Sequence, residues 1–116
     1  MDIIALSESD IDAMWTINEQ GLPGTGKVSK KEIVQLLEFS SLSVGAYVQG
    51  ELVGFVVCLP PKTAYGSLNY AWFNEHYESF VYVDRIAVSE ENRNKGVGSA
   101  LYLSLIHISE PTRPSI

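Results

Sequence analysis

The sequence of Val81–Tyr102 is VYVDRIAVSEENRNKGVGSALY, a β-branched run followed by a polar turn and two glycines. Alternation and β-branching over Phe80–Val88 predict a buried strand. The polar segment Ser89–Asn92 predicts a turn, and a helix is expected to begin near Lys95 or Gly96. A strand that leads directly into a helix is the arrangement in which we expect the functional site.

The start of this last helix is a candidate anion site. Its first backbone N–H groups have no partner within the helix and point outward. Gly96 and Gly98 lack a Cβ, so a phosphate can approach the backbone closely, and Arg93 or Lys95 adds positive potential to that of the helix dipole. A diphosphate is the natural ligand. The alternative is that the glycines permit a tight turn or close helix packing with no ligand.

Two helices are predicted before the first long strand. The first is capped by Ser7 or Ser9 and runs to about Gln20. The second begins after Ser29, which has capping-box spacing to Glu32. The residues expected on their packed faces are Ile11, Met14, Trp15 and Asn18 in the first helix and Ile33, Leu36 and Leu37 in the second.

Three further strands are predicted. Asp2–Leu6 is a short first strand. Ser43–Val48 and Leu52–Leu59 form an antiparallel pair, because Gln49-Gly50-Glu51 between them is a hairpin signal. Pro60-Pro61 ends the second of these strands, since proline cannot donate to a ladder.

The chain has 116 residues, of which 46% are hydrophobic, and this is typical of a single globular domain. The order β-α-α-β-β-(short helix)-β-α fits an α+β domain with one central sheet. The short helix is expected around Asn69–His76, inside a loop from Lys62 to Glu78 that contains an aromatic cluster.

Composition argues against several classes of partner. The formal net charge of −6 disfavours non-specific binding of nucleic acid or of an anionic membrane. The lone Cys58 lies in an apolar run, so we expect a small buried hydrophobe in a reducing cytoplasm. No basic leader or membrane-length apolar segment is found, so neither export nor insertion is expected.

The segment Asp84–Val88, followed by Arg93–Leu101, resembles the acetyl-CoA motif of the GNAT acetyltransferases. Upstream, Asn69–Phe73 and Phe80–Arg85 are similar to a bacterial subgroup of that family, so the resemblance covers roughly residues 2–102. It implies a GNAT-like α+β fold, in which a mixed central sheet is flanked by helices, and N-acetyltransferase activity.

The resemblance also implies a site. The backbone amides of Lys95–Ser99 would bind the pyrophosphate of acetyl-CoA, the co-substrate, and the backbone of Ile86 and Val88 would pair with the pantetheine arm. The acceptor would be a small-molecule or peptide amine. Formation of a homodimer is left as a possibility, and no metal is expected. The residues assigned to the cofactor are Ile86, Ala87, Val88, Arg93, Asn94, Lys95, Gly96, Val97, Gly98 and Ser99.

Acetyl transfer to an amine requires a neutral nucleophile, stabilisation of an oxyanion and a proton for the leaving thiolate. Asp84 is a candidate base, with a plain ion pair to Arg85 as the alternative. Glu75 is a second candidate, in a loop cluster with His76 and Glu78. The alternative is that this loop is simply exposed to solvent and has no catalytic role. The thiolate acid of the family lies on a later helix, and Tyr102 falls too early for that role. Tyr65, Tyr70, Trp72 and Phe73 could line a substrate pocket or fill the core.

The C-terminal segment has a second resemblance. Leu103–Arg113, LSLIHISEPTR, resembles a translated transposase adapter of the kind used in sequencing libraries. We therefore expect residues 1–102 to be the N-terminal part of one acetyltransferase domain and residues 103–116 to be a non-native tail. On that expectation the fold is incomplete at its C-terminal side, with an unpaired strand edge, and this chain is inactive.

Two other functions remain open. One is a non-catalytic acyl-CoA-binding or sensory domain on the same fold, because no base is unambiguous. The other is a nucleotide-binding protein with a Rossmann-type glycine turn. It is disfavoured because the glycines follow a four-residue polar turn and do not leave the strand immediately.

Overall fold

The computed structural model describes residues 1–60 and 82–109. Within these ranges four antiparallel strands form one sheet in the order β1-β2-β3-β4, and no parallel pair occurs among them. The strands are β1 (Asp2–Ala5), β2 (Leu42–Val48), β3 (Glu51–Leu59) and β4 (Tyr82–Val88). The helices are α1 (Ile11–Gln20), α2 (Lys30–Phe39) and α4 (Val97–Ser109), with short 3₁₀ turns η1 (Glu8–Asp10) and η2 (Glu90–Asn92).

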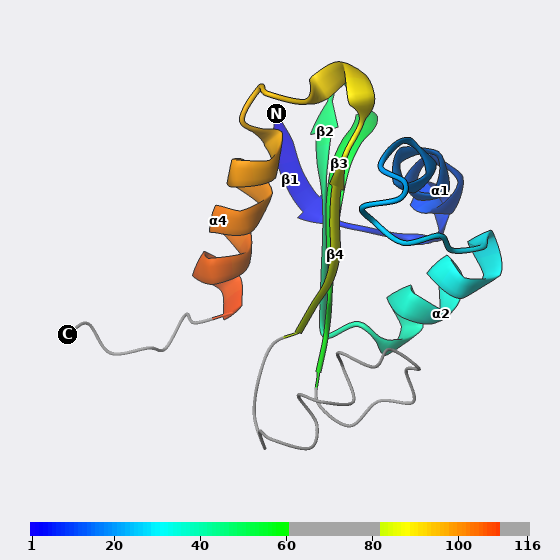
Figure 1. The fold of residues 1–116 in the computed structure, drawn as a ribbon. Helices are drawn as coiled ribbons and strands as arrows, with labels where there is room; N and C mark the ends of the chain where they lie inside the picture. The colour runs from blue at the N-terminus through cyan, green and yellow to red at the C-terminus, as the bar shows by residue number, and fades with distance from the viewer. Residues whose placement is uncertain (61–81, 110–116) are drawn as a thin grey trace.

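Helices α1 and α2 cover one face of the sheet, and α4 covers the other (Figure 1). The α+β class expected from the sequence is therefore confirmed. Strand β3 contributes to both cores because successive side chains of a strand point to opposite faces. Phe55 and Val57 pack toward α1 and α2, whereas Val56 and Cys58 pack toward α4. Burial on both faces explains why β3 is apolar without alternation.

Local sequence signals set the boundaries of the first helices. Ser29 and Glu32 form the predicted capping box, with both hydrogen bonds at 3.1 Å, and α2 begins at Lys30. Ser7 caps the 3₁₀ turn η1, in a second box with Asp10, so α1 starts only at Ile11. A capped turn thus precedes the regular helix that the sequence predicts.

The hairpin between β2 and β3 is confirmed. Its loop consists of Gln49 and Gly50, with φ angles of 51° and 80°. Two left-handed residues in succession match the right-handed twist of the flanking strands. The predicted loop with helical turns around Asn69–His76 lies outside the described residues, as do Glu75 and its neighbours.

Helix α4 begins at Val97, one or two residues later than the predicted start near Lys95 or Gly96. The carbonyl of Gly96 accepts a 3.0 Å hydrogen bond from the amide of Ala100, so Gly96 occupies the cap position. The helix continues past Tyr102 and buries Leu105 against the sheet beside Leu101. The predicted end of native sequence falls inside this helix and stays a prediction. In the part of the chain that the structure describes, no helix has the length and apolar character needed to cross a membrane.

Candidate active site

A cleft of about 580 Å³ lies between the last strand and the last helix. It brings together the two groups of residues that the sequence assigns to a coenzyme, because β4 leads through one turn into the start of α4. The residues that line it are Ile86, Ala87, Val88, Gly98, Ser99, Tyr102 and Leu103. Tyr102 and Leu103 are 52% and 65% exposed and were not predicted as site residues. They give the cleft an apolar rim.

The turn that leads into α4 contains two left-handed residues. Asn94 has φ 64° and Gly96 has φ 80°. Gly96 is therefore required by the backbone itself, and a Cβ there would meet nothing within 4 Å. Gly98 has no such constraint, and a Cβ added to it would meet only Val88, in ordinary contact at 3.8 Å. The space beside Gly98 is thus open to a ligand.

Two of the predicted coenzyme residues use their side chains elsewhere. Val97 is buried, 5% exposed, in the core beneath α4, so only its backbone is available to a ligand. Arg93 donates from Nη2 to the carbonyl of Gln20 at 2.9 Å and from Nε to the carbonyl of Val88 at 3.3 Å. Asn94 and Lys95 are exposed at the turn.

Strand β4 contains an irregularity at Asp84. In the β3–β4 ladder Val57 pairs with Arg85 and Cys58 pairs with Val83, so Asp84 is the extra residue of a bulge. The bulge changes which side chains face which helix layer. Val83, Ile86 and Val88 pack toward α4, while Tyr82 and Ala87 pack toward α1 and α2.

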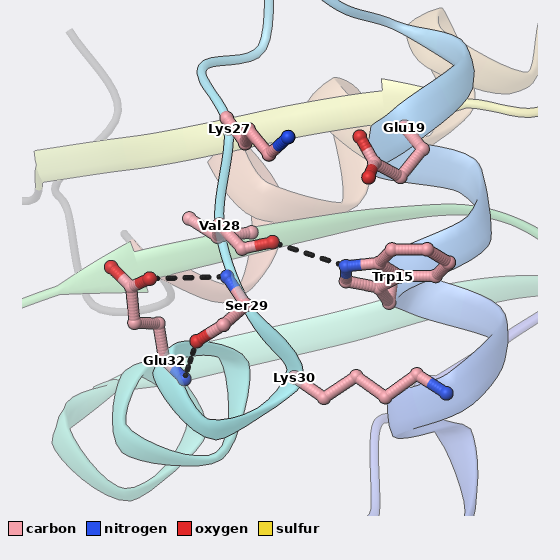
Figure 2. A pocket seen from close by; sticks show the side chains of 7 residues that line it. All are labelled: Trp15, Glu19, Lys27, Val28, Ser29, Lys30 and Glu32. Atoms are coloured by element: carbon pink, nitrogen blue, oxygen red, sulfur yellow. Dashed lines mark hydrogen bonds between the residues drawn. The ribbon is translucent and has the colours of Figure 1, made fainter.

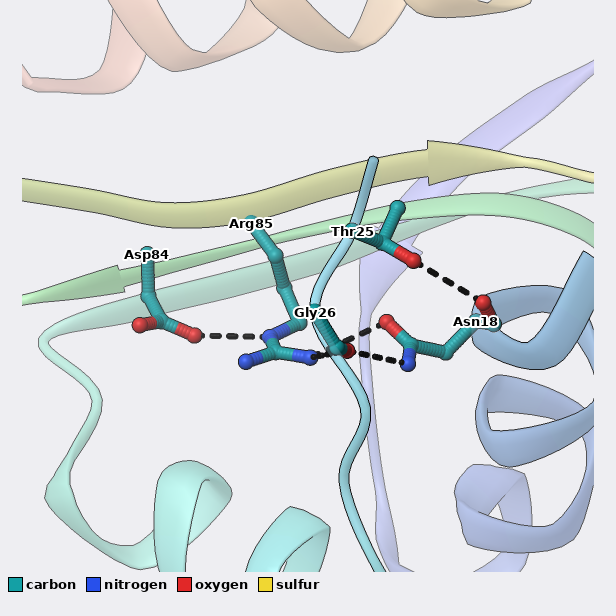
Figure 3. A network of polar contacts seen from close by, with 5 residues as sticks. All are labelled: Asn18, Thr25, Gly26, Asp84 and Arg85. Carbon is teal, nitrogen blue, oxygen red and sulfur yellow. Dashed lines mark hydrogen bonds and ion pairs between the residues drawn. The ribbon is translucent and has the colours of Figure 1, made fainter. Parts of the chain in front are cut away.

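The bulge also lets two consecutive residues interact. Arg85 Nε donates to Asp84 Oδ2 at 2.7 Å, and the side chains are 8% and 4% exposed. Arg85 Nη1 donates onward to Asn18 Oδ1 at 3.0 Å and to the carbonyl of Gly26 at 3.3 Å (Figure 3). Asn18 also donates to Gly26, and Thr25 donates to the carbonyl of Asn18, both at 2.9 Å. The structure therefore contains the ion pair that the sequence offered as an alternative to a free base.

Cys58 lies in the core between the sheet and α4. Burial raises the pKa of its thiol to about 11, and the charge of Asp84 adds to the shift. A thiol with this pKa is protonated at neutral pH and is a poor nucleophile. The expectation of a small buried hydrophobe is confirmed.

A second cleft, of about 650 Å³, lies where α1 meets the start of α2 (Figure 2). Here Trp15 Nε1 donates to the carbonyl of Val28 at 3.1 Å, and Lys30 Nζ lies 5.3 Å from the centre of the indole ring. Its charges are mixed, with Glu19 and Glu32 against the two lysines that line it. These contacts hold the α1–α2 connection, and no predicted site residue lies among them.

The model of the acetyltransferase (GNAT) family matches residues 11–112. The chain belongs to the GNAT family. The resemblance stated from the sequence is thereby confirmed. No curated protein matches the chain at a significant level.

Solved structures show the same GNAT fold. The ribosomal-protein-S18-alanine N-acetyltransferase of Escherichia coli has a TM-score of 0.70 at 19% identity, over 95% of this chain and 59% of that one. An aminoglycoside 6′-N-acetyltransferase of Acinetobacter haemolyticus has a TM-score of 0.67 at 17% identity, and the match covers 96% of this chain and 72% of that one. The GNAT-like decarboxylase GphF, in complex with isobutyryl-CoA, has a TM-score of 0.74 at 19% identity, and the match covers 98% of this chain and 61% of that one. The chain thus spans 59% of the first neighbour and 61% of the third.

Sequence reasoning missed two features of this GNAT site. The bulge at Asp84 has no signal in the sequence, because it depends on how β4 pairs with β3. Gln20, which binds the turn before α4, is likewise unmarked. Asn18 did give a signal, since a polar residue on an otherwise apolar helix face, 1% exposed here, requires a buried partner.

Proposed function

We propose that the protein is an N-acetyltransferase that binds acetyl-CoA in the cleft between β4 and α4. The observation that supports this most is the meeting of Ile86–Val88 with Gly98 and Ser99 at the exposed N-terminus of a helix in a GNAT fold. Bound there, acetyl-CoA supplies the acetyl group as a thioester. A GNAT neighbour is in complex with isobutyryl-CoA, which supports an acyl-CoA ligand for this fold.

The residues present fit such a coenzyme. The backbone amides of Lys95–Ser99 would hold the pyrophosphate, because the first N–H groups of α4 have no partner within the helix. A Cβ added at Gly96 would have no neighbour within 4 Å, and one added at Gly98 would contact only a methyl group of Val88, so the start of the helix is accessible. Among the described strands β4 pairs with β3 alone, and we propose that the backbone of Ile86 and Val88 pairs with the amides of pantetheine.

The proton-transfer group is a separate proposal. Asp84 is the described candidate, and its Oδ2 accepts a hydrogen bond from Arg85. Glu75 lies outside the described residues. The acceptor is a small-molecule or peptide amine, and we place the protein in the cytoplasm because Cys58 is a free, buried thiol.

Calorimetry with two ligands tests the binding proposal. Acetyl-CoA should bind the chain, whereas acetyl-pantetheine, which lacks the pyrophosphate, should bind at least about tenfold more weakly, a loss of about 1.4 kcal/mol. Equal affinity for the two ligands would contradict the proposal that the N-terminus of α4 binds the pyrophosphate. Release of free thiol, measured with a panel of amines, then tests transfer, and it would also refute the expectation from residues 103–116 that this chain is inactive.

A non-catalytic acyl-CoA-binding domain is the second candidate. It is favoured by one observation: the carboxylate expected as a base is buried and bound to Arg85. This candidate predicts tight binding of acetyl-CoA with no thiol release from any amine in the panel. Thiol release that depends on an amine would exclude it.

A further inference from the structure

The turn that precedes α4 is hydrogen-bonded to the last residue of α1, Gln20. Its side-chain Oε1 accepts a 2.8 Å hydrogen bond from the amide of Glu90. Its backbone carbonyl accepts the 2.9 Å hydrogen bond from Arg93 Nη2. Figure 1 shows the segment between β4 and α4 crossing the end of the sheet from the α1 side to the α4 side. Gln20 therefore binds the turn at both ends of η2.

The Arg93 contact is the chemistry that a helix C-terminus favours. Gln20 is the last residue of α1, so its carbonyl has no intrahelical donor and lies at the negative end of the helix dipole. A guanidinium suits this position because it is cationic and presents several donors in a fixed plane. Arg93 also donates to the carbonyl of Val88, so one side chain connects the end of α1 with the end of β4.

The remaining bonds of the turn leave little freedom. The amide of Ser89 donates to the carbonyl of Val53 at 2.8 Å, and the amide of Asn92 donates to the carbonyl of Ser89 at 2.9 Å. The chain is thus fixed at positions 89, 90, 92 and 93, and α4 begins at Val97. Only residues 94–96 connect these fixed points, two of them in the left-handed region. The direction of the amides that open α4 depends on where the turn is held.

We propose that Gln20 and Arg93 are positioning residues for the phosphate-binding turn, so that α1 sets the affinity for acyl-CoA without touching it. The inference rests on the proposed function. It reassigns Arg93, which the sequence suggests as a source of positive potential for the phosphates. Its side chain instead acts on the shape of the turn, through backbone carbonyls.

The first test is hydrogen exchange on the ligand-free chain. Gln20→Ala removes the acceptor of the Glu90 amide, so exchange of that amide and its neighbours up to residue 96 should accelerate by about threefold to tenfold, as expected for one hydrogen bond. Gln35→Ala is the matched control, because Gln35 is an exposed glutamine on α2. Equal exchange in the two variants would overturn the proposal.

The second test separates positioning from direct charge. Acetyl-CoA affinity is measured for Gln20→Ala, Arg93→Gln and Arg93→Lys. If Arg93 positions the turn, lysine restores little, because it keeps the charge but lacks the planar fork, and Gln20→Ala also weakens binding. Full affinity in Arg93→Lys, with a loss only in Arg93→Gln, would show a phosphate contact and overturn the proposal. Should the unaltered chain bind no acetyl-CoA, the proposed function fails, and the exchange experiment alone decides whether Gln20 shapes the turn.

Discussion

Arg85 Nε donates a 2.7 Å hydrogen bond to Asp84 Oδ2, although the two residues are consecutive on strand β4. Neighbouring side chains on a regular strand point to opposite faces, so this pair depends on the bulge at Asp84. The pair in turn stabilises the bulge, since separating two opposite charges at a buried site is costly. The bulge determines that the side chains of Ile86 and Val88 lie on the α4 side of the sheet, where both residues line the cleft. The ion pair therefore also affects the shape of the cleft wall.

Arg85→Ala should destabilise the protein strongly. It leaves the carboxylate of Asp84 buried without its partner and removes the donor to Asn18 and Gly26, with an expected loss of about 3–5 kcal/mol in the free energy of unfolding. Urea unfolding measures this directly. The control is Asp12→Ala, which breaks a 3.1 Å pair with Lys30 in which the side chains of Asp12 and Lys30 are 84% and 53% exposed. That exposed pair should contribute at most about 1 kcal/mol, and similar losses in the two variants would contradict the structural role of Arg85.

Stability should fall at alkaline pH because of Cys58. Its pKa is raised from 9.0 to about 11 in the folded protein. Between these values the unfolded thiol has lost its proton while the folded thiol keeps it, so unfolding becomes more favourable by about 1.4 kcal/mol per pH unit. Below pH 9 this contribution to the pH dependence disappears.

Urea unfolding of the unaltered chain and of Cys58→Ala at pH 8, 9 and 10 checks this prediction. The variant should have a lower stability throughout but a flatter decline from pH 9 to pH 10. Burial also raises the pKa of Tyr47, which donates to Asp10 at 2.8 Å. The Tyr47 hydroxyl begins to add to the decline as the pH approaches 10, but it does so equally in both proteins and cancels in the comparison. Parallel curves for the two proteins would show that Cys58 is not responsible.

Gly54→Ala should displace α4 from the sheet. A Cβ at this position on β3 would lie 2.9 Å from Val97 Cγ1 and 3.1 Å from the carbonyl oxygen of Ala87. The expected loss of stability is about 1–3 kcal/mol, as for other overpacked sites. Thermal unfolding checks it, and the conservative comparison is Gly98→Ala, where the added methyl group meets only an ordinary contact. An unchanged melting temperature in Gly54→Ala would mean that α4 does not pack here as described.

Much of the fold could be predicted because its signals are local. The capping box at Ser29 and the hairpin at Gln49–Gly50 each depend on a few adjacent residues, and both are found in the structure. The strand–turn–helix of the coenzyme motif is equally local, and the helix starts only one or two residues later than predicted, because Gly96 serves as the cap. The family followed from the same segment.

The rest depends on contacts between residues far apart in the sequence. Arg93 looks like a phosphate ligand from its neighbours, but its guanidinium binds the carbonyl of Gln20. The pairing of Asp84 with Arg85 follows from the register of β4 on β3, which no pattern within β4 reveals. The contacts of both residues could therefore be identified only from the three-dimensional arrangement.

The amides at the start of α4 are proposed to bind the pyrophosphate of acetyl-CoA, and Gly98→Ala probes this contact. Alanine fits the ligand-free site and favours the helix over glycine by about 1 kcal/mol, so the melting temperature should stay the same or rise. Calorimetry should nevertheless show acetyl-CoA affinity reduced by about tenfold or more, because the methyl group occupies the space that the phosphate needs. An affinity equal to that of the unaltered chain would contradict the claim.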